Sequence, residues 1–215
     1  MLIKVCGLKE TGNVKELLKK GTPDLLGMIF YEKSKRYIGD ESFEIGETSS
    51  HISKVGVFVN ASIEQIIQMQ QAFGLEWVQL HGDEDLEYIS VLRTQTNMKI
   101  IKVFRVEDKI DLEAVKPFRP FVDYFLFDTQ TAAYGGSGNR FDWQALEHYN
   151  LETPFIVSGG IDLEHVSEIT ALFKKIPQMA GVDINSKFET APGIKDTEKV
   201  ARFINIIREN KIDQL

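Results

Sequence analysis

Hydrophobic and polar positions are arranged in blocks along the chain, with apolar runs of strand length followed by amphipathic stretches of helix length. The expected strands cover residues 3–7, 25–31, 54–60, 77–82, 100–106, 124–129, 155–158 and 181–185. The expected helices cover residues 14–20, 62–73, 85–94, 112–118, 142–149, 163–174 and 197–210. Ser62 with Gln65 predicts a capping box, and Asp142 and Thr197 are expected N-caps. The stretch between 31 and 54 lacks a helical period, so we expect a long loop there, with at most a short helix.

Strict alternation of strands and helices predicts a parallel sheet with helices outside it. Eight such units in a compact chain favour a closed (β/α)8 barrel, the TIM-barrel architecture, over an open doubly wound sheet. The strand faces agree with a barrel, because Tyr124, Leu126 and Asp128 share one face, with the polar residue last. The sequence has no low-complexity tract or linker, and we expect residues 1–215 to form one domain.

The composition narrows the partners that the chain can have. The 215 residues are 43% hydrophobic and carry a formal net charge of −7. This acidic balance argues against nucleic acid and anionic membranes as partners, so we expect a small-molecule ligand. The apolar stretches are too short to span a bilayer, and no signal peptide is visible. With a single cysteine, these features predict a cytoplasmic location.

Cys6 is that single cysteine, at the end of the first expected strand, where Leu2-Ile3-Lys4-Val5-Cys6 runs into Gly7. A lone cysteine forms no intrachain disulfide, which leaves packing or reactivity. Packing is the commoner role of a free cysteine. The position favours reactivity instead, because chemistry in such barrels is located at the carboxyl ends of the strands.

Asp128 ends the sixth expected strand. An aspartate in this place is most often an N-cap for the next turn. The apolar residues before it also favour a raised pKa, which a general acid requires. Cys6 and Asp128 are both expected at the same barrel mouth. A proton acceptor and a proton donor on opposite sides of a substrate fit an isomerisation.

Glycines follow the strands near the end of the chain. In barrels, the loops after the last two strands commonly bind phosphate through backbone N–H groups. Here these loops hold Ser158-Gly159-Gly160 and Asn185-Ser186. The alternative is that Gly159 and Gly160 only form a tight turn. A further loop after Asp128 contains Gly136 and Gly138, and its glycine content is typical of a loop that closes on a ligand.

Other candidates fall at strand ends or just beyond them. The Arg36 guanidinium can bind a carboxylate through two hydrogen bonds, although a solvated basic patch is the alternative. Asp183 ends the eighth strand and can accept a hydrogen bond from a substrate. His81 is expected near the site without a catalytic role. The histidines form no zinc-binding pattern, and the sequence has no nucleotide-binding fingerprint.

These residues occur together in segments that resemble the phosphoribosylanthranilate isomerase family of tryptophan biosynthesis. The matching segments are residues 4–8, 27–31, 34–37, 55–60, 78–82, 127–129, 135–138, 158–161, 181–186 and 192–196. The resemblance implies an Amadori rearrangement of N-(5-phosphoribosyl)anthranilate without a cofactor. It implies that Asp128 protonates the ribose ring oxygen and that the Cys6 thiolate removes a proton from the adjacent sugar carbon. It also implies that Arg36 contacts the anthranilate carboxylate and that the glycine loops bind the phosphate.

Two alternatives stay open at the level of sequence. The related sugar-phosphate isomerase of histidine biosynthesis resembles a duplicated half-barrel and has an aspartate in place of Cys6. A second alternative is a barrel that binds a phosphorylated ligand without turning it over. The sequence does not distinguish a monomer from a homodimer.

Overall fold

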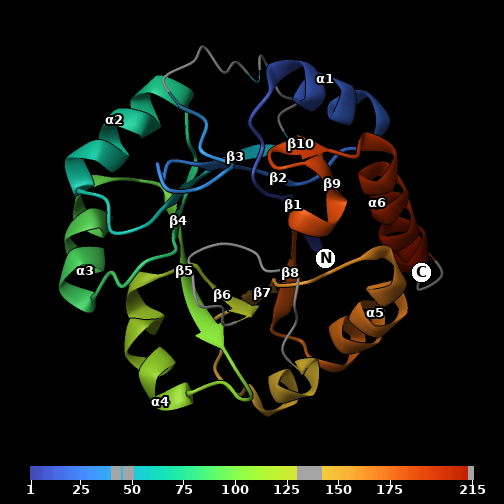
Figure 1. Cartoon of the computed structure of the whole chain (residues 1–215). Helices are drawn as coiled ribbons and strands as arrows, with labels where there is room; N and C mark the ends of the chain where they lie inside the picture. The colour runs from blue at the N-terminus through green and yellow to red at the C-terminus, as the bar shows by residue number, and fades with distance from the viewer. Residues whose placement is uncertain (40–44, 46–50, 130–141, 213–215) are drawn as a thin grey trace.

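The computed structural model describes residues 1–39, 45, 51–129 and 142–212. Within these residues, eight parallel strands follow one another around a closed barrel, and helices surround them (Figure 1). The barrel strands are β1 (Leu2–Val5), β2 (Leu25–Ile29), β3 (Ser53–Phe58), β4 (Trp77–Leu80), β5 (Lys99–Val106), β6 (Tyr124–Thr129), β7 (Phe155–Val157) and β8 (Met179–Ile184). The predicted (β/α)8 barrel is therefore confirmed.

The helices lie between these strands and outside the barrel. The α-helices of the described residues are α1 (Thr11–Lys20), α2 (Ile63–Phe73), α3 (Leu86–Gln95), α4 (Leu112–Val115), α5 (Val166–Lys175) and α6 (Thr197–Ile212). The 3-10 helices are η1 (Lys116–Phe121), η2 (Trp143–His148), η3 (Leu163–His165) and η4 (Ser186–Phe188). Between β2 and β3, the residues that the structure describes form turns and no helix, as the sequence predicts for them.

Side-chain caps fix the starts of several helices. Ser62 caps α2 and Asp142 caps η2, each by accepting a hydrogen bond from a backbone N–H group, as predicted. The prediction that Thr197 is an N-cap is wrong. Thr197 is the first residue of α6, and the carboxylate of Asp196 accepts the hydrogen bond from Lys199 N at 3.0 Å. An ionised carboxylate before the first turn also complements the positive end of the helix.

Three of the predicted helices are wholly or partly 3-10 helix, and the one expected at 163–174 begins as η3 before it continues as α5. The helix expected at 112–118 is α-helical only to Val115 and continues as η1. Pro117 and Pro120 explain the change, because proline lacks the N–H group that an α-helix needs in its interior. The helix expected at 142–149 is η2, a six-residue 3-10 helix. Segments this short gain little from α-helical hydrogen bonding.

The barrel interior has an apolar half and a polar half. The apolar half is a cluster of buried inward-facing side chains from Leu25, Val55, Trp77, Ile101, Val103, Leu126 and Ile156. The polar half lies nearer the carboxyl ends of the strands and contains buried Lys4, Cys6, Gln79, Ser158 and Asp183, with Asp128 beside them. The expected inward face of β6 is confirmed, because Tyr124 and Leu126 belong to the interior cluster while Phe125 and Phe127 pack outward.

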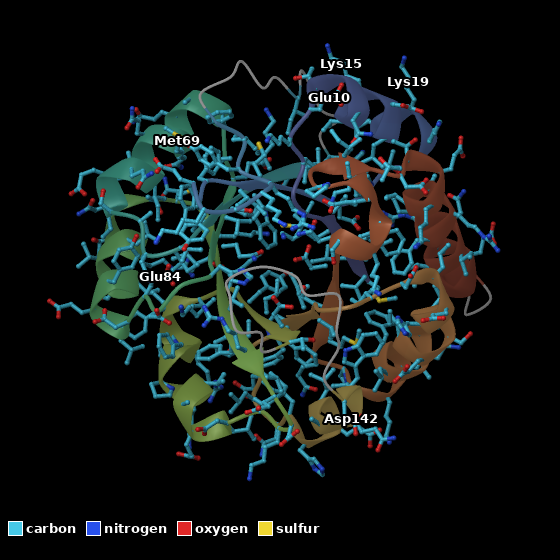
Figure 2. The ribbon with its side chains drawn as sticks, viewed as in Figure 1. Glu10, Lys15, Lys19, Met69, Glu84 and Asp142 are labelled. Carbon is cyan, nitrogen blue, oxygen red and sulfur yellow. The ribbon has the colours of Figure 1, made fainter. Side chains whose placement is uncertain are left out.

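A small two-stranded sheet lies beside the barrel mouth. It is formed by β9 (Glu189–Ala191) and β10 (Ile194–Lys195), which pair antiparallel, and it contacts α1 (Figure 1). This sheet was not predicted, because its strands are only three and two residues long. At the outer surface, charged side chains such as Lys15 and Lys19 project away from α1 (Figure 2). In the described parts of the chain, no helix combines the length and the apolar character that crossing a membrane requires.

Candidate active site

A cleft opens at the carboxyl ends of the barrel strands, with about 740 Å³ of empty space that includes open solvent. Ten of the predicted site residues line it, namely Cys6, Arg36, His81, Asp128, Ser158, Gly159, Gly160, Asp183, Asn185 and Ser186. Gly136 and Gly138, which were predicted to belong to the same site, lie outside the described residues.

Cys6 lies at the floor of the cleft. The strand predicted at 3–7 is shorter in the structure, because β1 ends at Val5. Cys6 still donates its backbone N–H to Ile184 O at 2.9 Å, so it stays aligned with β8. Gly7 then takes a left-handed φ of 74°, which turns the chain out of the barrel. The cysteine is 4% exposed, and its side chain faces the cleft.

Lys4 is one of the residues of this site that were not predicted from the sequence. It lies fully buried one step below Cys6 on the same inward face of β1, and its Nζ is 3.0 Å from Asp183 Oδ1. Its ammonium also forms a side-chain hydrogen bond with Cys6. The signal was present in the sequence, since residues two apart on a strand share a face. A lysine within the apolar run before Cys6 therefore points into the barrel.

Cys6, Lys4 and Asp183 shift one another's pKa values. Burial raises the pKa of the Cys6 thiol above its ordinary value, and the positive charge of Lys4 opposes that rise. For Lys4 itself, burial disfavours the charged form, but Asp183 and Cys6 outweigh burial and raise its pKa. Lys4 is thus a permanent cation below the thiol. It lowers the cost of forming a thiolate, although the free protein holds mainly the thiol at neutral pH.

Asp128 faces the same cleft from the end of β6. Burial and, next, repulsion from Asp183 raise the pKa of Asp128 from 3.8 to about 6. Its Oδ1 accepts a hydrogen bond from Thr129 N at 2.9 Å, and Ser158 supplies a second hydrogen bond. A carboxyl group with this pKa is partly protonated near neutral pH, as a general acid must be.

His81 stands next to Asp128, with Nε2 3.6 Å from Oδ2 of the carboxyl group. Burial, together with the charge of Lys4, lowers the pKa of His81 to about 3, so the ring is neutral. Gln79 Nε2 lies 3.0 Å from His81 Nδ1. The neutral ring therefore brings no charge to the carboxyl group.

The predicted glycine loops lie on the β7 and β8 side of the cleft. Gly159 and Gly160 have positive φ values of 91° and 63°, and a side chain at Gly159 would collide with Thr129. Both glycines line the cleft. Ser186 and Lys187 line the same side. Lys187 was not predicted, and it adds a cation where an anionic ligand group is expected.

Arg36 reaches the cleft from the loop after β2, and it has a protein partner there. Its guanidinium donates to the carboxylate of Glu189 on β9 from Nε, at 2.9 Å to Oε1 and 3.0 Å to Oε2, and from Nη2, at 2.7 Å to Oε2. Lys195 Nζ binds the same carboxylate at 2.7 Å. Glu189 and Lys195 were not predicted from the sequence. Arg36 and Lys187 line this side of the cleft, and the fully buried Lys195 pairs with Glu189, so three cations and one carboxylate give a local positive excess in a chain of net charge −7.

Comparison with known proteins gives the family. A family model described as N-(5'phosphoribosyl)anthranilate (PRA) isomerase matches residues 3–206. The N-(5'-phosphoribosyl)anthranilate isomerase of Parabacteroides distasonis is 42% identical over 210 residues, which are 96% of this chain and 93% of that protein. That of Phocaeicola vulgatus is 40% identical over 209 residues, covering 97% and 98% of the two chains.

Solved structures agree with the sequence relatives. Phosphoribosyl anthranilate isomerase from Thermotoga maritima superposes with a TM-score of 0.80 at 30% identity, over 97% of this chain and 99% of that chain. A phosphoribosyl anthranilate isomerase in complex with reduced 1-(o-carboxyphenylamino)-1-deoxyribulose 5-phosphate superposes with a TM-score of 0.77 at 28% identity, over 97% and 100%. The family model and the relatives both cover nearly the whole chain. The chain belongs to the N-(5'-phosphoribosyl)anthranilate isomerase family.

Proposed function

We propose that this chain converts N-(5-phosphoribosyl)anthranilate to 1-(2-carboxyphenylamino)-1-deoxy-D-ribulose 5-phosphate in tryptophan biosynthesis, by general acid–base catalysis without a cofactor. The observation that carries the proposal is the common cleft of Cys6 and Asp128, which lie at the carboxyl ends of β1 and β6 and differ in their protonation chemistry. The family assignment supports the substrate.

In the first proposed step, Asp128 gives its proton to the ribose ring oxygen. The bond between this oxygen and the anomeric carbon breaks, and the lone pair of the anthranilate nitrogen forms a protonated Schiff base. A carboxyl group whose pKa is about 6 suits this step, because its neutral form is accessible near pH 7. The neutral ring of His81 then lies next to the new carboxylate.

In the second proposed step, the Cys6 thiolate removes the proton from the neighbouring sugar carbon. The electron pair of this C–H bond moves toward the Schiff base and gives a neutral enolamine, which tautomerises to the ketone. Lys4 stabilises the thiolate by its charge. Asp128 regains a proton and Cys6 releases one before the next turnover, so the net reaction is an isomerisation.

The rim of the cleft supports the assignment of the substrate ends. We infer that Arg36 binds the anthranilate carboxylate. We infer that Ser158, Gly159, Gly160, Asn185 and Ser186, with Gly136 and Gly138, form the phosphate side. Lys187 lies where it would add to phosphate binding. Asp183 remains a proposed substrate contact, although Lys4 already occupies one of its oxygens.

Three broader expectations remain proposals. We infer that residues 1–215 are one domain, since the described elements belong to one barrel and its attached two-stranded sheet. A monomer and a homodimer are both proposed states, and the structure of a related isomerase from Thermotoga maritima describes monomers generated from a dimeric protein. A cytoplasmic location is a prediction that cell fractionation tests.

Turnover of freshly generated phosphoribosylanthranilate, followed by the loss of its fluorescence, tests the function. Cys6→Ala and Asp128→Asn should each lower kcat at least about 100-fold, the scale of a positioned acid or base. Asp111→Asn is the matched control, because it removes one carboxylate at the N-cap of α4, and asparagine is an equally good cap. An inactive wild type would refute the function. Near-normal kcat in Cys6→Ala would remove the proton-abstraction step alone.

A further inference from the structure

The contact between Arg36 and Glu189 joins two loops that lie far apart in the sequence. Arg36 follows β2, whereas Glu189 begins β9, 153 residues later. The pair is well shielded, with side-chain exposures of 14% for Arg36 and 4% for Glu189. A parallel pair of hydrogen bonds between guanidinium and carboxylate fixes orientation as well as distance. The direction of the Arg36 side chain therefore depends on where Glu189 is held.

Glu189 is itself held by its own two-stranded sheet. Lys195 Nζ on β10 lies 2.7 Å from Glu189 Oε1, and Gly193 N donates to the same oxygen at 3.1 Å. Lys195 Nζ also donates to Asn185 Oδ1 at 2.8 Å, which ties the sheet to the end of β8. Lys195 has a side-chain exposure of 0%. The carboxylate is thus anchored from the barrel side independently of Arg36.

Among the residues that the structure describes, none forms a hydrogen bond with the second edge of the guanidinium. Glu189 takes the edge formed by Nε and Nη2, so Nη1 and the second hydrogen of Nη2 form the edge that remains. Arg36 lines the cleft. Burial opposes ionisation of Glu189, but Arg36 and Lys195 outweigh burial and hold the pKa of its carboxyl group below the ordinary value. Lys195 supplies a second positive charge to this carboxylate, so the three groups together keep a net positive charge.

Gly7 provides the third side of this arrangement. A Cβ atom at Gly7 would lie 2.7 Å from Arg36 Cδ and 2.7 Å from Asn185 Oδ1, so the backbone after Cys6 packs directly against the arginine stem. Arg36 is therefore confined between this backbone and Glu189. Few other directions are open to its free edge.

We propose that Glu189 is a positioning residue that aims the free edge of Arg36 into the cleft and thereby makes the site selective for a substrate whose aromatic ring carries a carboxylate. The inference rests on the proposed function, in which Arg36 receives the anthranilate carboxylate. It differs from a purely structural role, in which Glu189 would only fasten β9 and β10 to the barrel. A structural role would affect ligands with and without the carboxylate alike.

Calorimetric binding of two reduced product analogues separates the two roles. One ligand is reduced 1-(o-carboxyphenylamino)-1-deoxyribulose 5-phosphate, and the other is its phenylamino counterpart without the carboxylate. In Glu189→Gln, which keeps size and polarity, we expect the Kd of the carboxylate ligand to rise about tenfold, the lower end for loss of a charged hydrogen bond. The Kd of the other ligand should change less than twofold.

Two further variants keep the test decisive. Glu189→Asp retains the charge but shortens the side chain, so it should also weaken the carboxylate ligand selectively. Glu84→Gln removes another buried carboxylate that anchors loops through Lys102, without touching Arg36, and should affect both ligands equally. Thermal unfolding of each variant reports whether it is folded.

The outcomes separate this inference from the function on which it rests. A wild type that binds neither ligand would refute the proposed function. A wild type that binds both equally would refute the role of Arg36, and the positioning role with it. If the wild type discriminates and Glu189→Gln weakens both ligands equally, or neither, only the positioning role is overturned.

Discussion

The two halves of the barrel interior are built from the same strands but hold opposite chemistry. The amino-terminal half contains apolar side chains such as Leu126 and Ile156, both fully buried. The carboxyl-terminal half holds Lys4 and Cys6 at nearly the same depth of burial, and Asp128 with 15% of its side chain exposed. On β6, one alternation step separates Leu126 from Asp128. A single strand thus contributes both to the core and to the cleft.

The two halves contribute differently to the free energy of folding. Burying a large apolar side chain stabilises the folded state by about 1.5–3 kcal/mol. Burying an ionisable group disfavours its charged form, which costs stability but shifts the pKa toward a catalytic range. The apolar half therefore stabilises the packing of the strands. The polar half depends on that rigid packing, which shields its ionisable groups from water.

The largest effect is expected from emptying the apolar half. Leu126→Ala should lower the free energy of unfolding by about 2–5 kcal/mol, because it leaves a cavity in a fully buried cluster. The kcat of the folded variant should stay within about threefold of the wild type. Urea unfolding and turnover under folded conditions measure the two quantities. A large fall in kcat without loss of stability would contradict the claim that the apolar half determines stability and the polar half determines turnover.

Asp128→Asn should have the reverse effect on stability. The pKa of Asp128 is about 6 in the folded protein against 3.8 for an ordinary aspartate. Below pH 3.8 both states are protonated, so the folded state bears no cost. Between pH 3.8 and about 6 the unfolded chain ionises this carboxyl group while the folded protein keeps it protonated, so stability falls progressively, and the loss reaches about 3 kcal/mol above pH 6. The asparagine variant lacks this loss.

Denaturant unfolding from pH 4 to pH 8 tests whether ionisation of Asp128 lowers the stability of the folded protein. The stability difference between Asp128→Asn and the wild type should grow in favour of the variant as pH rises, and it should level off above about pH 7. Asp111→Asn controls for the loss of one negative charge. A difference that shrinks with rising pH would mean that the folded protein favours the ionised form of Asp128.

A smaller effect is expected from Lys4→Met, which makes the polar half resemble the apolar half. Removing this cation raises the cost of the Cys6 thiolate, so kcat should fall about tenfold, below the effect of removing the base itself. The alkaline limb of kcat/KM against pH should also move to higher pH. Steady-state kinetics across pH measure both quantities.

Lys102→Met is the matched control for that variant. Lys102 is also buried and pairs with a carboxylate, Glu84, at 2.8 Å, but it does not line the cleft. Both variants break a buried ion pair and should lower stability. Only Lys4→Met should move the pH profile. An equal shift in both variants would mean that Lys4 acts through stability and not through Cys6.

The sequence alone predicted the barrel and the strand ends of the candidate site. Hydrophobic alternation is a local property, so it identified β6 and put Asp128 on the inward face. The same rule, applied to β1, would have found Lys4. The predictions failed where local rules compete, as in the 3-10 turn at Pro117 and the cap of α6, which Asp196 and not Thr197 provides.

By itself, the sequence determined the eightfold alternation, the family, and the arrival of Cys6 and Asp128 at one end of a barrel. Only the tertiary structure decided the charge partners. Lys4 meets Asp183 because closing the barrel puts β1 beside β8, and Arg36 meets Glu189 because a two-stranded sheet of five residues lies at the mouth. The hydrophobic periodicity of a strand or helix depends only on residues that are close in the sequence. The pairing of charges 179 and 153 residues apart, and the pKa shifts that result, depend on how the chain closes in space.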